Sequence, residues 1–491
     1  MDRSEFMPGT DPGRWRAFAV CLVAGAMTLL DVSIVNVALP SLQAGLRVSS
    51  EALSWAVAGY TLTFGLTLVP AGRLGDTFGR RRMFLIAVAV FTAVSVLCGL
   101  SDSGTWLVCA RLAQGVAGGM LTPQVVGLMQ QLFTGRERGV AAGLYGAMVA
   151  AATAIGPLAG GLLIQAAGSA NGWRWVFFVN LPIGLPAFVL GTRLLPRDPA
   201  RAWAGRLDLV GVALLGGGIT AVILPLIVAE RGQGSAPWSL LGLGAVLLAC
   251  FVAWEGHYRR RKGRPLVNFE LLRRRPYAIG SLVGVLYFAG YTGVLFILSL
   301  YFQQGLGYSA LAAGAAGTPF SIGSSISAAL GGRVAYRFGR LLVVTGTLTV
   351  VLALAAIALL VRYDHGGRMW LLLLGPLLVA GWGSGLVIGP NLTLALQHVP
   401  PAEGGTAAAV LQTGQRIGSA FGLAIAGSVF LGTLTASRGD FPLSAGRGFF
   451  GSAALVGLAL LVAITDLLLP ERGRRGAAAT ATWKRRDLDD A

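Results

Sequence analysis

Long apolar segments follow one another along nearly the whole chain, and short polar segments separate them. Each apolar segment has about 20 residues or more, which is enough for an α-helix to cross a hydrocarbon core of ~30 Å. Membrane-spanning strands would alternate apolar and polar residues, and these segments do not alternate. The pattern predicts an all-α polytopic membrane protein with fourteen transmembrane helices, at residues 17–41, 53–75, 83–101, 106–132, 139–167, 175–195, 207–229, 238–256, 277–302, 310–335, 341–361, 369–396, 406–435 and 448–469.

The composition agrees with a chain that is surrounded mainly by lipid. Of its 491 residues, 55% are hydrophobic and 12% are charged, whereas soluble domains have ~25% charged residues. The net charge of +18 is also typical of nucleic-acid-binding proteins, but here the basic residues stand in short clusters between apolar segments, as at 80–82 and 259–262. Such clusters set membrane topology, so we expect the lipid bilayer as a partner and no nucleic acid.

The distribution of basic residues supports the predicted number of helices. With fourteen helices, 30 of the 39 Lys and Arg residues fall on one side of the membrane and 7 on the other, while Arg111 and Arg416 fall within helices. Basic residues accumulate on the cytoplasmic side of membrane proteins. We therefore expect a multi-pass protein of the inner (cytoplasmic) membrane with both termini in the cytoplasm.

Two basic stretches, 196–206 and 257–276, divide the helices into groups of six, two and six. The residues GGRVAYRFGR at 331–340 resemble GRLGDTFGRR at 72–81, which suggests that the two groups of six are repeats. We predict an N-terminal six-helix bundle at 1–200, two linker transmembrane helices at 201–270, a C-terminal six-helix bundle at 271–470 and a charged cytoplasmic tail at 471–491.

The sequence lacks the usual signatures of metal sites, cofactor sites and membrane enzymes. Its four cysteines all fall in apolar segments and are expected to be small buried hydrophobes, and its three histidines form no pair at helical spacing. Its two lysines, Lys262 and Lys484, lie in no phosphate-binding loop, which argues against ATP-driven pumping. We expect no metal, no cofactor and no enzymatic activity.

One acidic residue, Asp31, lies in the middle of a predicted helix, in the segment LLDVSIVNVALP. A charged side chain at the bilayer centre costs ~2.5–3.5 kcal/mol, so an acid there suggests a function. We predict that Asp31 takes up and releases protons during transport. The alternative is a structural hydrogen bond or salt bridge.

Arg111, near the start of the fourth predicted helix in RLAQGVAGGML, is the expected counterpart of Asp31. A buried arginine keeps its proton and needs an anion or several carbonyl groups as partners. Arg111 close to Asp31 would stabilise the ionised acid, and substrate or a conformational change could separate the two. Proton binding to Asp31 would then be coupled to that separation. The alternative is that Arg111 only caps carbonyl groups at the helix end.

The segment GRLGDTFGRRR predicts a tight turn between the second and third helices. Gly72 and Gly79 permit close packing, and Asp76 stands near Arg80 and Arg81. We predict that Asp76 forms ion pairs with Arg80 or Arg81 that hold the cytoplasmic side in one state, as a conformational latch. A charge cluster that only sets the topology is the alternative.

Small residues cluster in the predicted fifth helix. The block GPLAGG is more informative than any single glycine, because the chain has 71 glycines. We predict close packing of this helix against another, with a local kink at its proline. The residues concerned are Gly143, Gly156, Pro157, Gly160 and Gly161.

Polar and aromatic residues at helical positions are candidates for the lining of a central cavity. An apolar cavity with a few hydrogen-bonding groups suits bulky, amphipathic or cationic molecules. Packing in the core or at the membrane interface is the alternative for the aromatic residues. The candidates are Asn36, Trp55, Tyr60, Gln114, Gln124, Tyr145, Tyr287, Tyr291, Gln303, Asn391, Gln412, Gln415 and Arg416.

Four of these segments, LDVSIVNVALP, GRLGDTFGRRR, RLAQGVAGGML and AIGPLAGG, occur in the order that is typical of the major facilitator superfamily. With fourteen helices and WRWVFFVNLPIG opening the sixth, the chain resembles the drug:proton antiporter branch of that superfamily, which contains multidrug and antibiotic exporters. The resemblance covers nearly the whole chain. It implies a major facilitator fold, with two pseudo-symmetric six-helix bundles about a central cavity that opens alternately to each side.

The resemblance also implies roles for particular residues. Asp31 matches the membrane-embedded acid that such exporters protonate, Arg111 the basic residue tied to coupling, and Asp76 the latch. Gly156 and Pro157 match the core of the antiporter motif. The loop motif GRLGDTFGRRR has a second-half copy at 331–340, in which Tyr336 stands in the place of the acid Asp76. A second latch at this copy is therefore expected to be weaker or absent.

Together these features predict a proton-coupled antiporter that exports small amphipathic or cationic drugs and antibiotics from the cytoplasm. The expected partners are a small-molecule substrate and protons, and the family default is a monomer. An exporter of a lipid, a siderophore or another natural product remains an alternative, as does an uncoupled facilitator of the same fold.

Overall fold

The computed structural model describes residues 12–46, 48–168, 171–198, 208–230, 237–262, 266–363 and 368–468, and all regular structure within these ranges is helical. The predicted charged tail at 471–491 lies outside the described residues, as does the start of the predicted linker at 201–207.

A helix lies at each position where the hydrophobic pattern predicts one. The first half contains α1 (Pro12–Leu46), α2 (Ser50–Phe78), α3 (Arg80–Gly99), α4 (Gly104–Leu132), α5 (Gly135–Ala167), α6 (Gly172–Phe178) and α7 (Asn180–Leu194). Two further helices follow, α8 (Leu209–Glu230) and α9 (Ser239–Lys262). The second half contains α10 (Glu270–Arg273), α11 (Arg275–Leu300), a π-helical turn (Tyr301–Gly305), α12 (Ala310–Phe338), α13 (Arg340–Tyr363), α14 (Met369–Leu396), a short 3₁₀ turn (Pro401–Glu403), α15 (Gly404–Ala436) and α16 (Phe441–Leu468).

Serine side chains determine where several helices begin. Ser49 accepts a hydrogen bond from the backbone N–H of Ala52 at 3.2 Å, and Ser309 accepts one from Ala312 at 3.2 Å. Such caps satisfy backbone donors that have no partner in the first turn. The helices therefore extend several residues beyond their apolar parts, and most are longer than the predicted ranges.

Ten helices in the described part of the chain are long and apolar enough to cross a membrane. The predicted number was fourteen, and the helices that miss the criterion are α2, α4, α8 and α12. In α4 the cause is a set of polar residues that the fold buries, among them Arg111, Gln114 and Gln124. α12 similarly buries Ser324 and Ser327. The membrane spans predicted at α2, α4, α8 and α12 therefore stay a prediction.

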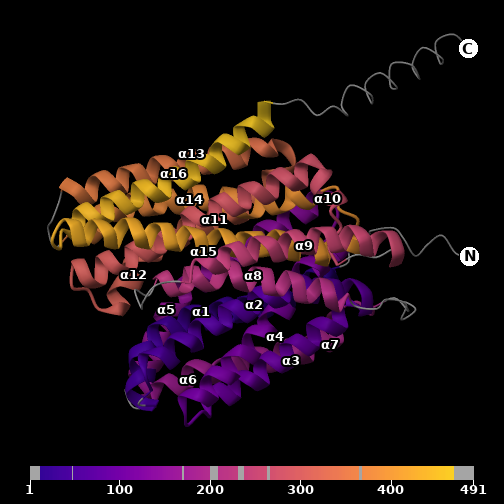
Figure 1. Cartoon of the computed structure of the whole chain (residues 1–491), viewed down its shortest axis with the longest axis horizontal. Coiled ribbons are helices and arrows are strands. Elements are labelled where there is room, and N and C mark those ends of the chain that lie inside the picture. The colour runs from indigo at the N-terminus through magenta and orange to yellow at the C-terminus, as the bar shows by residue number, and fades with distance from the viewer. Residues whose placement is uncertain are drawn as a thin grey trace, which may run out of the picture.

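Most helices run along the long axis of the molecule. In Figure 1, α11, α13, α14 and α16 lie in the upper part, α1–α7 in the lower part, and α8, α9, α12 and α15 across the middle. α1 begins at the same end where α16 ends. At this end Arg14 in α1 pairs with Glu137 in α5, and Arg275 in α11 pairs with Asp466 in α16.

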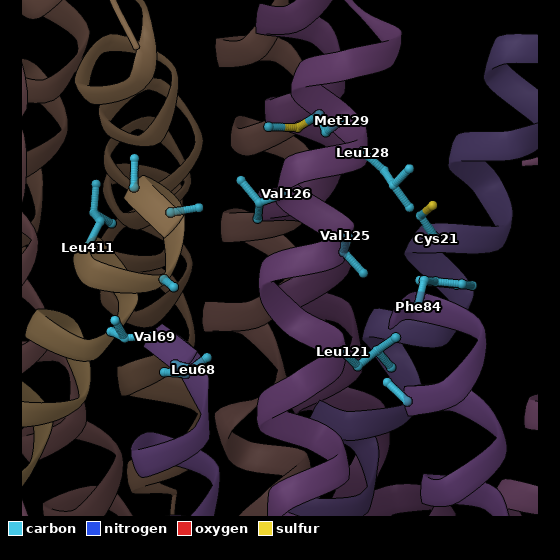
Figure 2. Packing of buried hydrophobic residues seen from close by; sticks show 14 of the residues in the cluster. Cys21, Leu68, Val69, Phe84, Leu121, Val125, Val126, Leu128, Met129 and Leu411 are labelled. Atoms are coloured by element: carbon cyan, nitrogen blue, oxygen red, sulfur yellow. The ribbon is translucent and has the colours of Figure 1, made fainter. Parts of the chain in front are cut away.

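Apolar side chains fill the space between the helices. One buried cluster is drawn from α11–α16, and the largest joins α1–α5 and α7 to residues of α14 and α15. Figure 2 shows α4 in this larger cluster, with Leu121 and Leu128 on the side of Phe84 and Cys21. The second half of α4 is therefore largely internal, whereas residues near its start, such as Trp106, are exposed.

The cysteines only partly follow the prediction that all four are buried. Cys21 and Cys98 are buried, but Cys109 and Cys250 are exposed on the outer surfaces of α4 and α9. The prediction was wrong for these two because a lipid-facing surface is as apolar as a core. An apolar segment therefore does not show which of its faces is buried.

Candidate functional site

The carboxylate of Asp31 is the centre of a buried polar network between α1, α4 and α7. Arg111 Nη1 lies 2.6 Å from Asp31 Oδ2, and both side chains are almost completely buried. The other carboxylate oxygen, Oδ1, accepts hydrogen bonds from Gln114 Nε2 and Asn180 Nδ2, each at 2.9 Å. The predicted approach of Arg111 to Asp31 is therefore present in this structure, and three donors surround the acid.

Arg111 has partners besides the acid. Its Nε donates to the carbonyl oxygen of Ala56 in α2 at 3.3 Å, and its Nη1 also contacts Gln114 Oε1 at 2.7 Å. Its Cζ lies 4.2 Å from the centre of the Tyr60 ring, a cation–π contact. The carbonyl group that Arg111 binds belongs to another helix, so this bond is not the cap at the helix end that stood as its alternative.

Sequence reasoning missed two members of this network, Asn180 and Ser95. Asn180 is the first residue of α7, directly after the break between α6 and α7. Its Nδ2 also donates to Ser95 Oγ at 2.9 Å, and Ser95 in turn donates to the Phe177 carbonyl at 2.9 Å. A single asparagine in the segment WRWVFFVNLPIG was the available signal.

Asp76, near the end of α2, connects that helix to the beginning of α15. Its carboxylate accepts hydrogen bonds from the backbone N–H groups of Gly405 at 3.2 Å and Thr406 at 2.8 Å, and from the Thr406 hydroxyl at 2.8 Å. An anion is favoured at a helix N-terminus, where N–H groups lack partners and the helix dipole is positive. A Cβ at Gly72 would lie 2.8 Å from the Gly405 carbonyl oxygen, so the two helices are in close contact here.

Arg80 is the partner of Asp76 within the predicted latch. Its Nη2 lies 2.7 Å from Asp76 Oδ1, and both side chains are buried. It also donates to the carbonyl groups of Gly127 at the end of α4 and Pro401 before α15. The pair thus joins α2, α3, α4 and α15 at one end of the molecule.

Arg81 has a different partner from the predicted one. Its side chain donates to the Thr192 carbonyl, and the backbone N–H groups of Arg81 and Arg82 donate to Asp198 at 3.2 and 3.1 Å. Asp198 therefore caps α3. The cap needs Gly79, which has a φ of +107° and where a Cβ would lie 2.2 Å from Asp198 Oδ2.

In the second-half copy of the loop motif, at 331–340, Arg340 forms an ion pair and a hydrogen bond within its own half. Tyr336, in the place of the acid, is 78% exposed. Arg340 instead pairs with Asp466 of α16 at 2.6 Å and donates to the Pro276 carbonyl at 3.1 Å. The helices of the two halves do meet here, since a Cβ at Gly332 would lie 2.6 Å from the Gly139 carbonyl oxygen of α5. Among the described residues, however, no acid at this position binds the start of α5 as Asp76 binds the start of α15.

The glycines of α5 allow contact with two different helices. A Cβ at Gly143 would lie 2.6 Å from the Ala328 carbonyl oxygen and 2.7 Å from Gly332 Cα in α12. A Cβ at Gly156 would lie 2.2 Å from Ser33 Cβ in α1. Gly160 faces Ile34 of α1, whereas Gly161 faces Leu311 and Pro157 faces Gly314, both in α12. α5 thus packs closely between α1 and α12.

Replacement of Gly143 by alanine is expected to lower the free energy of unfolding by roughly 1–3 kcal/mol, because the backbones of α5 and α12 must separate. Thermal unfolding of the purified protein measures the effect. Gly65→Ala in α2 is the matched control, since a Cβ there meets nothing within 4 Å. Equal unfolding temperatures for the two variants would contradict the prediction.

A cavity of about 360 Å³ lies between α1, α2, α4, α5, α11, α14 and α15. Seven of the predicted cavity residues line it: Asn36, Tyr60, Tyr145, Tyr291, Gln412, Gln415 and Arg416. Apolar residues such as Val32, Phe64, Met148 and Phe288 form much of the remaining wall. Tyr60 also contacts Arg111, so one side chain connects the cavity with the Asp31 network.

The other predicted cavity residues lie elsewhere. Gln114 belongs to the Asp31 network, and Trp55 is 40% exposed on the surface of α2. The amides of Gln124 and Asn391 each donate to a backbone carbonyl, of Ala71 and Gly280, both at 2.8 Å. Tyr287 is buried and stacks on Tyr291. Gln303 is exposed on the π-helical turn and donates to Ser299 Oγ of α11.

The long apolar helices around an internal cavity are those of a polytopic membrane protein. The family model described as Major Facilitator Superfamily matches residues 21–423. The chain belongs to this superfamily.

Its relatives include exporters of antibiotics. The chain is 39% identical over 424 residues to the "Probable actinorhodin transporter" of Streptomyces coelicolor, covering 86% of this chain and 73% of the relative. It is 36% identical over 466 residues to the "Puromycin resistance protein pur8" of Streptomyces alboniger, covering 94% and 90%. Among solved structures, the proton:xylose symporter XylE superposes with a TM-score of 0.66 at 17% identity, covering 93% of this chain and 96% of XylE, which shows the shared fold.

Proposed function

We propose that this protein is a proton-coupled antiporter that exports small amphipathic organic molecules, antibiotics among them, from the cytoplasm by alternating access. The observation that carries the proposal is the buried pair of Asp31 and Arg111, which touches the cavity through Tyr60. The names of the two relatives above support export of antibiotics.

The proposed architecture is that of the fourteen-helix branch: a bundle of α1–α7 (residues 1–200), a bundle of α11–α16 (271–470), and α8 and α9 as two linker transmembrane helices (201–270). The helix positions support it, as does the burial of the polar residues that lower the hydropathy of α4 and α12. The basic residues at the ends of α1, α3 and α9 support cytoplasmic termini in the inner membrane. We propose a monomer.

In the proposed coupling step, a proton binds to Asp31 and removes the negative charge that holds Arg111. The guanidinium then loses its counter-charge in a site of low dielectric constant, where an unpaired ion is unfavourable. Arg111 therefore favours a rearranged state, and the Tyr60 ring, which packs on the guanidinium, transmits the change to the cavity. Release of the proton restores the pair.

In the same proposal, Gly72, Asp76, Gly79, Arg80 and Arg81 form the latch of the cytoplasmic side. Thr406, whose N–H and hydroxyl bind Asp76, is six residues from Gln412 in the cavity wall, about 9 Å along α15. A closed latch thus supports a barrier between the cavity and this end of the molecule. The close packing of α5 at Gly143, Gly156, Pro157, Gly160 and Gly161 supports its role as the antiporter motif.

Growth inhibition of cells that express the chain tests the proposal, with and without a protonophore. The panel contains puromycin together with anionic, neutral and cationic aromatic compounds. We expect resistance to some of them that disappears when the protonophore collapses the gradient. Sensitivity equal to that of cells with an empty vector would contradict export, and resistance that persists with the protonophore would contradict proton coupling.

A further inference from the structure

Arg416 places a positive charge in the wall of the cavity. It lies on α15, is partly buried, and its Cζ is 4.7 Å from the centre of the Phe64 ring of α2. None of the ion pairs among the described residues includes Arg416, and no aspartate or glutamate lines the cavity. Asp31, the nearby acid, is already paired with Arg111.

A second donor with no partner lies one helical turn away. Gln412 also lines the cavity and is only 8% exposed. Its Nε2 has no hydrogen-bond partner among the described residues. Residues four apart on a helix point to the same side, so the Gln412 amide and the Arg416 guanidinium face the cavity together.

Neither the Gln412 amide nitrogen nor the Arg416 guanidinium has a hydrogen-bond acceptor or a counter-ion among the residues that the structure describes. A buried donor without a partner and a cation without a counter-charge both raise the free energy of the empty protein. A guanidinium binds a carboxylate through two parallel hydrogen bonds, which are stronger than bonds between neutral groups. A cation in the cavity would instead meet a charge of its own sign.

The rest of the wall suits an aromatic or apolar body. Phe64, Tyr145, Phe288 and Tyr291 line the same cavity as the two donors. The volume of about 360 Å³ is at the lower end of the range of ~300–1,000 Å³ for sites that bind drug-sized molecules.

We propose that this cavity selects substrates with a carboxylate on an aromatic body, and that Arg416 is the counter-ion and Gln412 the second donor. The inference rests on the proposed function, because it takes the cavity to be the substrate site. It replaces the expectation of cationic substrates with that of anionic ones.

Binding to the purified full chain in lipid nanodiscs tests the inference without requiring transport. The probes share one ring system and differ in charge: naphthalene-1-carboxylate, naphthalene-1-carboxamide and 1-naphthylmethylammonium. Calorimetry measures each Kd for the wild type, Arg416→Gln, Arg416→Lys and Gln412→Leu. Arg447→Gln, which removes the same charge from an exposed position of α16, is the matched control.

We expect the wild type and Arg447→Gln to bind the carboxylate at least ~10-fold more tightly than the other two probes. Arg416→Gln should weaken carboxylate binding by roughly 10- to 100-fold with little effect on the carboxamide, and Arg416→Lys should recover part of the loss. Gln412→Leu should give a smaller loss, and it also tests the site if Arg416→Gln does not fold.

Three results would overturn the inference: equal binding of the three probes by the wild type, no binding of any of them, or an unchanged carboxylate Kd in the Arg416 and Gln412 variants. Resistance in cells would still support export in those cases. Conversely, carboxylate selectivity in nanodiscs without efflux from cells would contradict the proposed function and leave the inference standing.

Discussion

Asp31→Asn is expected to reduce proton-driven efflux by ~100-fold or more, on the scale of losing an essential proton-transfer group. Asparagine has nearly the shape of a protonated aspartate but can neither gain nor lose a proton. It therefore holds the site in one state of the cycle. Proteoliposomes loaded with the compound to which expressing cells are most resistant, under an imposed pH gradient, measure the loss.

The stability of this variant needs a control of its own, because Arg111 would remain buried beside a neutral amide. Removal of one partner of a buried ion pair costs ~3–5 kcal/mol. The double variant Asp31→Asn/Arg111→Gln removes both charges, so its unfolding temperature should lie nearer to that of the wild type while its coupled transport stays absent. Active efflux by either variant would show that Asp31 is not the proton carrier.

Asp76→Asn is expected to lower turnover by roughly 10-fold or more while changing the Kd for substrate little. The carboxylate of Asp76 now accepts hydrogen bonds from the N–H groups of Gly405 and Thr406 and from the guanidinium of Arg80. The amide of asparagine would place an N–H group against these donors, which cannot accept it. The contact between α2 and α15 would be weakened, and closure of this end with it. Initial rates of efflux at saturating substrate, with Kd values from calorimetry, separate the two quantities.

Glu270→Gln is the matched control for the latch. It breaks the ion pair of Glu270 with Arg259 of α9. The Arg259 side chain is 50% exposed and the Glu270 side chain 58%. Exposed pairs contribute ~0–1 kcal/mol, so turnover should stay within about twofold of the wild type. If Asp76→Asn and Glu270→Gln behave alike, Asp76 has no part in closure.

The sequence predicted those features that a local pattern determines. The positions of the helices follow from the length of apolar segments, and an acid and an arginine in such segments have few partners other than each other. The approach of Arg111 to Asp31 could therefore be expected. The pairing of Asp76 with Arg80 follows from their spacing of four residues.

Features that depend on packing between distant segments could not be predicted in this way. Nothing in the local sequence pattern links Asp466, near the end of α16, to Arg275 and Arg340, with which the fold pairs it. Asn180 faces Asp31 because the helix breaks between α6 and α7. The cavity gathers side chains from seven helices, so a sequence cannot show that Gln412 lines it while Asn391 does not.

The contact of α5 with α12 at Gly143 and Gly332 has a mechanical consequence. No side chains interdigitate where two backbones touch, so a small rotation there breaks few contacts. Sliding or separation of α5 and α12 would instead lose the fit between the two helices. We expect this point to act as a fulcrum, about which the halves tilt while their distance stays fixed. Opening at one end of the protein would then close the other by simple leverage.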